Sequence, residues 1–170
     1  DLNWREANVL RAIAKYMKQG GIQTSVEEIA SIIIQNREVA EGIFGLFAEK
    51  FLNKNSVTAN MIAKSTDLIL QNINKITSTE ADKIFRCYLD IILAMLRTNY
   101  DQTDIDGRNK SYLSFKIDSA KVTWLPLPYP YCEIFVYSNR FEGIHLRGGK
   151  VARGGPFNIP FLPARKRPCE

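Results

Sequence analysis

The sequence has few of the residues that build metal and disulfide sites. Its 170 residues contain one histidine, His145, and three widely spaced cysteines, Cys87, Cys132 and Cys169, with no Cys-x-x-Cys pair. A zinc site draws its four ligands from closely spaced cysteine and histidine residues. We therefore expect no metal site, and we expect the cysteines to be reduced thiols.

Long apolar runs are also missing. No stretch approaches the roughly 20 uninterrupted apolar residues that a membrane-spanning helix needs. The first residues, Asp1 to Glu6, lack the basic and apolar regions of a signal peptide. We expect a soluble, cytoplasmic protein.

A strong excess of one charge is absent too. The net charge is +5, and the three cations and one acid of residues 156–170 contribute +2 of it. The remaining charges are dispersed rather than clustered, which argues against nucleic-acid binding. If such binding occurred, it would use these basic residues: Arg147, Lys150, Arg153, Arg165, Lys166 and Arg167.

Proline is absent before Pro126, and the proline-free part is rich in helix-forming residues. Capping pairs, each a polar residue followed three positions later by glutamate, precede three apolar patterns of helical spacing. Gly20-Gly21 is a typical stop for the first pattern. The capping pairs are Asn3 with Glu6, Ser25 with Glu28, and Thr77 with Glu80. Two further helices are predicted near 37–52 and 57–75, and we assign Trp4 and Phe47 to the core. Five amphipathic helices joined by short connections indicate a helical bundle.

The pattern changes after Leu96. Residues 97–107 are polar and rich in turn formers, which predicts a loop and a boundary. Tyr112, Phe115 and Ile117 then mark a strand of about six residues. Residues 133–137 carry the strongest strand signal in the chain, and residues 143–147 are its expected hairpin partner.

These patterns predict an α+β fold. A bundle of about five amphipathic helices (1–97) is followed by a polar linker loop (98–110). A β region (111–155) with two or three antiparallel strands at about 111–148 comes next, and an irregular proline-rich tail (156–170) ends the chain. No internal repeat occurs.

The segment from Phe141 to Gly155 holds half of the ten glycines, interleaved with Arg147, Lys150 and Arg153. Glycine permits tight turns and close approach to a ligand, and the cations attract carboxylates or phosphates. The spacing fits neither a Walker A loop nor a GxGxxG loop. Two interpretations stay open: an anion-binding turn, or a hairpin followed by a flexible turn.

Two other features could indicate a catalytic or metal-binding role, namely His145 and the acidic residues of the polar loop. His145 lies in a predicted strand on the face opposite Ile144. No nucleophile or orienting carboxylate is near it in sequence, so a general-base role is disfavoured. The acidic residues at 101, 104 and 106 do not follow the alternating spacing of an EF-hand, which favours a solvated loop.

Several blocks of the chain resemble the large bacterial NAD-dependent glutamate dehydrogenases. The most specific is the segment 128–155, Pro-Tyr-Pro-Tyr-Cys-Glu-Ile-Phe-Val-Tyr-Ser-Asn-Arg-Phe-Glu-Gly-Ile-His-Leu-Arg-Gly-Gly-Lys-Val-Ala-Arg-Gly-Gly. Supporting blocks occur in the family's order at 2–6, 96–100 and 112–118, so the resemblance covers about 155 residues. It implies the stretch in which the family's helical region runs into the first strands of the substrate-binding part of the catalytic core.

The resemblance also implies a remnant of the substrate site. The equivalent turn in the wider superfamily is Lys-Gly-Gly, which helps to bind the side-chain carboxylate of the substrate. By this likeness Arg153, Gly154 and Gly155 occupy the turn, and Lys150 lies beside it. Family members continue with a hydrophobic residue and Arg-Trp-Ser-Asp, whereas this chain has Pro156-Phe157-Asn158.

The family's catalytic lysine, the acid that assists it and the Rossmann cofactor domain lie further along. The resemblance therefore implies a fragment, with a tail typical of a shifted or split reading frame. The intact family uses NAD to convert L-glutamate to 2-oxoglutarate, ammonia and NADH in amino-acid catabolism. We expect this chain alone to bind no cofactor, to have no catalytic residue and to be inactive, so its standing as an enzyme is open.

An alternative from another class is an interaction or regulatory module. Strands at 132–147 would leave edges and apolar faces that the intact enzyme covers. The chain could then complement a separately encoded, downstream catalytic chain, or associate with itself.

Overall fold

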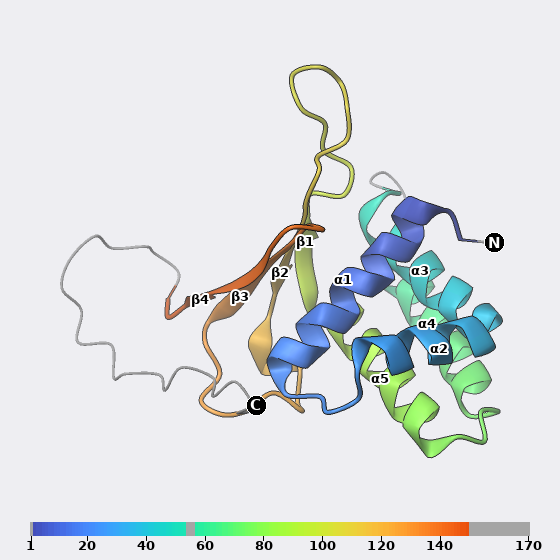
Figure 1. Cartoon of the computed structure of the whole chain (residues 1–170). Coiled ribbons are helices and arrows are strands. Elements are labelled where there is room, and N and C mark those ends of the chain that lie inside the picture. The colour runs from blue at the N-terminus through green and yellow to red at the C-terminus, as the bar shows by residue number, and fades with distance from the viewer. Residues whose placement is uncertain (1, 54–56, 150–170) are drawn as a thin grey trace.

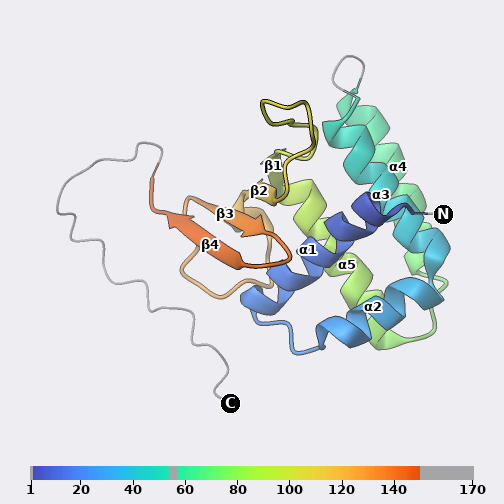
Figure 2. The same ribbon diagram turned by 45° about the horizontal axis from the view of Figure 1, so that its top comes forward.

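The computed structural model describes residues 2–53 and 57–149. Within these residues five helices lie side by side with a four-stranded sheet, and the first helix packs on the sheet (Figure 1, Figure 2). The predicted α+β class is confirmed. No helix in the described part of the chain is long and apolar enough to cross a membrane.

The helices are α1 (Trp4–Gly20), α2 (Val26–Gln35), α3 (Arg37–Phe51), α4 (Ala59–Ile73) and α5 (Thr79–Ala94). The capping pairs predicted at Asn3 and Ser25 are confirmed, since each forms a complete capping box with Glu6 and Glu28. Gly21 ends α1 in the left-handed conformation with φ of 103°, which glycine adopts without strain.

Two details of the helical prediction are wrong. Ser78, not Thr77, caps α5, because its hydroxyl accepts from the amide of Ala81. Trp4 is 80% exposed rather than part of the core. It is the first residue of α1, and a helical side chain points back toward the N-terminus, here beyond the edge of the core.

The sheet contains β1 (Met95–Thr98), β2 (Leu113–Ile117), β3 (Cys132–Tyr137) and β4 (Glu142–Arg147), in the order β1-β2-β3-β4 and antiparallel throughout. A short 3₁₀ turn, η1 (Ser119–Lys121), follows β2. The hairpin predicted between 133–137 and 143–147 is confirmed. The structure has four strands where two or three were expected, because Met95, which falls within the predicted helical region 1–97, begins β1.

One hydrophobic core joins helices and sheet. Alternate residues of β2, namely Leu113, Phe115 and Ile117, are buried against the helices, so Leu113 takes the place that we predicted for the exposed Tyr112. Aromatic side chains connect α3 to the sheet, since the Phe47 ring lies 6.3 Å from that of Phe115. The helical and strand parts of the chain are therefore a single folded unit.

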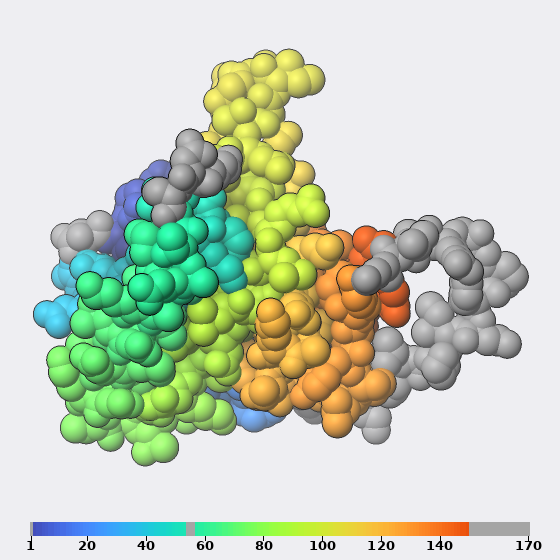
Figure 3. Space-filling model, turned by 180° about the vertical axis from the view of Figure 1, so that it is seen from behind, coloured from blue at the N-terminus to red at the C-terminus, as the bar shows by residue number. Residues whose placement is uncertain are grey.

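The loop between β1 and β2 extends away from this body (Figure 1, Figure 3). An isolated bridge pairs Thr103 with Asn109, and Ile105 is fully exposed.

Candidate functional site

The β3–β4 hairpin leads the chain to the predicted substrate site. Its second strand ends at Arg147, and Gly148 and Gly149 follow with open space where a Cβ would lie. The four residues predicted to hold the substrate lie outside the described residues: Lys150, Arg153, Gly154 and Gly155. The structure thus shows the strand that enters this segment, and the site itself stays a prediction.

His145 is exposed on β4 and lies directly opposite Ile134 of β3. No hydrogen bond to its imidazole from another described residue is present. A general base needs a proton donor within hydrogen-bond reach and a group that orients it. The described neighbours of His145 supply neither.

Of the three acidic loop residues, Asp104 stabilises the backbone of the loop. One carboxylate oxygen of Asp104 accepts from the amides of Asp106 and Arg108, both at 3.0 Å. This is the usual way in which aspartate stabilises a turn. Among residues 2–53 and 57–149, no three histidine, cysteine, aspartate or glutamate side chains come together as a metal site.

A buried carboxylate was missed by the sequence analysis. Glu133 of β3 is fully buried between the sheet and α1, and the Tyr16 hydroxyl donates to it at 2.8 Å. The Tyr16 ring also contacts Phe135 at 5.5 Å. The signal was present, because the alternation in 133–137 puts Glu133 on the same face as the core residues Phe135 and Tyr137. A buried polar group needs a hydrogen-bond partner, so the contact between Tyr16 and Glu133 fixes how α1 lies on the sheet.

Lys50 closes the C-terminal end of α5. Its ammonium donates to the carbonyls of Ile92 and Leu93 at 2.9 and 2.7 Å. Burial, together with the nearby positive charge of Lys121, lowers the pKa of Lys50 to about 8. A lysine with a lowered pKa can act as a base, but here the ammonium donates two hydrogen bonds to the helix end, which is a structural role.

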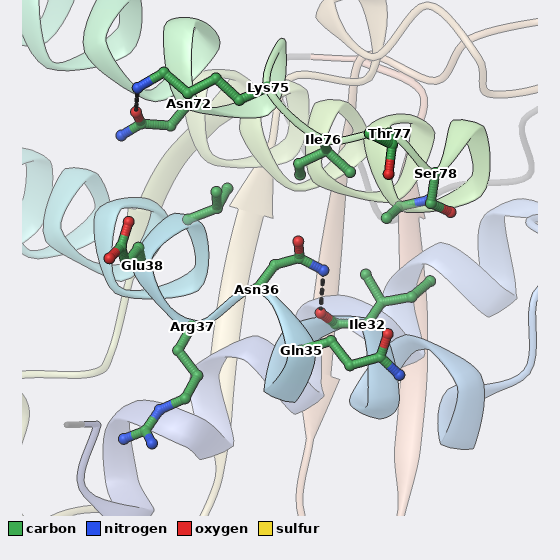
Figure 4. A pocket seen from close by; sticks show the side chains of 12 residues that line it. Ile32, Gln35, Asn36, Arg37, Glu38, Asn72, Lys75, Ile76, Thr77 and Ser78 are labelled. Carbon is green, nitrogen blue, oxygen red and sulfur yellow. Dashed lines mark hydrogen bonds between the residues drawn. The ribbon is translucent and has the colours of Figure 1, made fainter.

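A polar hollow of about 620 Å³ lies where the α2–α3 junction faces the α4–α5 connection (Figure 4). Two of its polar side chains form hydrogen bonds to residues three or four positions away in the sequence. Lys75 donates to the Asn72 side chain, and Asn36 donates to the carbonyl of Ile32. Arg37 points away from Thr77 and Ser78 in this view. The side chains do not converge on a common point, so the hollow does not form a reactive site.

Two protein families match successive parts of the chain. Residues 1–53 match the family described as glutamate dehydrogenase, helical motif 3. Residues 67–157 match the family described as bacterial NAD-glutamate dehydrogenase, catalytic domain. The two matches meet in the structure where α1 packs on β3.

Curated relatives agree with these matches. The chain is 43% identical over 159 residues to the NAD-specific glutamate dehydrogenase of Pseudomonas aeruginosa. The proteins of the same name from Halomonas elongata and Mycobacterium tuberculosis are 41% and 37% identical over 155 and 157 residues. Each alignment covers 91% of this chain, and the chain spans about 10% of the length of each relative.

Proposed function

The chain belongs to the bacterial NAD-glutamate dehydrogenase family, and we propose that it is the stretch in which the helical part of such an enzyme supports the first strands of the substrate-binding part. In the whole enzyme these residues would serve the conversion of L-glutamate and NAD to 2-oxoglutarate, ammonia and NADH. The observation that carries this proposal is the contact of α1 with β3. Tyr16, inside the helical-motif match, donates to Glu133, inside the catalytic-domain match.

We propose that Arg153, Gly154 and Gly155 hold the side-chain carboxylate of the substrate, with Lys150 close by. The support is the resemblance of this segment to the Lys-Gly-Gly turn of the wider superfamily, with arginine as the cation. An arginine can bind a carboxylate through two parallel hydrogen bonds. Gly154 and Gly155 would let the backbone come close to the substrate.

The residues of this chain do not fit NAD on their own. The sequence has no GxGxxG loop. A dinucleotide-binding domain is built from parallel strands with crossover helices, whereas every strand pair in the described sheet is antiparallel. We propose that the cofactor and the proton-transferring groups are supplied by other parts of the enzyme, and that the 170-residue polypeptide alone does not turn over glutamate.

A chimera tests the proposed role. The aligned residues of the Pseudomonas aeruginosa relative are replaced by those of this chain, and NADH formation is followed as a function of glutamate concentration. We expect activity to persist, with Arg153→Ala raising the KM for glutamate roughly 10- to 100-fold through loss of a charge-assisted hydrogen bond. Arg140→Ala, at an exposed position in the β3–β4 turn, is the matched control and should leave the KM unchanged.

A folded but inactive chimera would contradict the proposed role. An Arg153→Ala variant with the KM of the parent chimera would contradict the substrate contact alone. The expected cytoplasmic location stays a prediction.

A second candidate role, as a module that complements a separate catalytic chain, is favoured by one observation. β4 is an edge strand among the described strands, and Phe141 beside it is 58% exposed. An edge strand can pair with another chain.

Co-expression with the C-terminal remainder of the Pseudomonas relative should yield a stable complex by size exclusion. Separate elution of the two polypeptides would argue against this role, and a homodimer would indicate self-association instead.

A further inference from the structure

The sheet has one face packed on the helices and one face turned away from them, which we call the outer face. Phe115 and Phe135 point to the core from β2 and β3. Because side chains alternate along a strand, their neighbours Lys116 and Ile134 lie on the outer face. Antiparallel sheets often leave one face to water, so exposure alone indicates no ligand.

Two cations lie directly opposite each other on this face. Arg97 of β1 pairs with Lys116 of β2. Residues in such positions have Cβ atoms roughly 4.5–5.5 Å apart, and like charges there are destabilising. The structure gives neither side chain a hydrogen bond or ion pair with another described residue. The repulsion is therefore not relieved within the described part of the chain.

A third cation and several neutral polar groups surround this pair. Arg97, Lys116 and Arg147 line one hollow of about 340 Å³ on the outer face. None of the hollow's lining residues, all from the described ranges, is aspartate or glutamate. The remaining residues that line it are Thr98, Asn99, Gln102, Tyr112, Ser114 and Ile134.

We propose that this hollow binds a small oxyanion, a dicarboxylate or a phosphate monoester, between Arg97 and Lys116, with Arg147 on a third side. The anion would turn a repulsive pair into two attractive contacts. Guanidinium groups bind carboxylates and phosphates through two hydrogen bonds, and the lysine adds a point charge. The hydroxyls of Ser114 and Tyr112 can donate further hydrogen bonds. This site differs from the turn at 153–155 and does not rest on the proposed function.

Thermal unfolding of the full 170-residue chain tests the site. Sodium phosphate and sodium succinate are each compared with sodium chloride at matched ionic strength, and unfolding is followed by circular dichroism. A specific anion should raise the Tm by about 3–6 °C at ten times its Kd. A rise with phosphate alone points to a phosphate ester, and a rise with succinate alone points to a dicarboxylate.

The variant Lys116→Gln distinguishes an anion-binding lysine from one with only a structural role. It should raise the Tm in chloride, because it removes the like-charge repulsion, and it should abolish the extra rise with the specific anion. Lys64→Gln makes the same charge change at an exposed position of α4 and should respond to the anions as the unsubstituted chain does.

Amide chemical shifts of the unsubstituted chain give a second readout that needs no variant. On addition of the active anion, the perturbed amides should cluster at β1, β2 and the end of β4. Equal Tm values in all three salts, a Lys116→Gln variant that keeps the anion effect, or shifts spread over the helices would overturn the proposal.

Discussion

At the scale of single residues, the close fit of Gly20 against the loop after η1 gives the sharpest stability prediction. A Cβ on Gly20 would lie 2.6 Å from the Trp124 ring and 2.9 Å from a methyl group of Leu125. Leu125 is buried and the partly buried Trp124 packs against the core, so Gly20→Ala should lower the free energy of unfolding by about 1–3 kcal/mol. Urea unfolding followed by tryptophan fluorescence measures this change.

Gly45 is the matched control for this substitution. It is an exposed residue in the middle of α3, with no atom within 4 Å of its added Cβ. Gly45→Ala should stabilise the protein by about 0.5–1 kcal/mol, because alanine loses less backbone entropy in a helix. Equal effects of the two substitutions would show that Gly20 is not packed as described.

The half-buried Lys50 predicts a pH dependence. Its pKa is about 8 in the folded chain, below the ordinary value of 10.5. Between pH 8 and pH 10.5 the Lys50 amine is protonated in the unfolded chain and largely deprotonated in the folded chain. The free energy of unfolding therefore rises with pH across this window, and this gain is absent below about pH 8. Solvent screening at a half-buried site reduces the effect to roughly 1 kcal/mol.

Unfolding by urea at pH 7.5 and pH 10, with Lys50→Met and the unsubstituted chain side by side, isolates this group. The unsubstituted chain should gain stability relative to Lys50→Met as the pH rises. Lys64→Met, at an exposed position of α4, should show no such difference. An unchanged gap between Lys50→Met and the unsubstituted chain at both pH values would contradict the lowered pKa.

At the scale of elements, the sequence interpretation and the structure differ in the residue that caps the start of α5. The Ser78 hydroxyl, not that of Thr77, accepts from a helix amide. Ser78→Ala should therefore cost about 1 kcal/mol, the usual loss at an N-cap. Thr77→Ala should change the stability by less than about 0.5 kcal/mol. Chemical denaturation of both variants measures these losses. A larger loss for Thr77→Ala than for Ser78→Ala would contradict the assignment of Ser78 as the N-cap.

Local signals explain which elements could be predicted. Capping at Asn3 and Ser25, the stop at Gly21 and the β3–β4 hairpin all depend on residues a few positions apart. The strand β1 could not be found in this way. Met95 continues the apolar spacing of α5, and only pairing with β2, which begins eighteen residues later, makes it extended. Tertiary pairing overrode the local pattern.

The same limit applies to the sites. Glu133 could have been noticed as a charge at a core-facing position, but its partner Tyr16 is 117 residues away. The opposition of Arg97 and Lys116 depends on strand register, which the long polar loop between β1 and β2 does not determine. The substrate-binding role of segment 150–155 was predicted by resemblance, and it stays a prediction.

At the scale of the whole molecule, helices and sheet are stabilised by one core that crosses the two family matches. The Phe47 ring contacts Phe115 of β2, and Tyr16 contacts Phe135 of β3. The chain therefore should unfold in one cooperative step, so that helical circular dichroism and tryptophan fluorescence report the same midpoint. Two separate midpoints would mean that the helical part and the sheet fold independently.

We propose that these residues supply a scaffold and the entry to a substrate-binding turn, and that hydride transfer needs residues outside this stretch. Titration of the purified 170-residue chain with NAD, followed by calorimetry and by NADH absorbance after addition of glutamate, tests this claim most directly. We predict no saturable NAD binding and no glutamate-dependent NADH. Saturable binding, or turnover that depends on both substrates, would contradict the account.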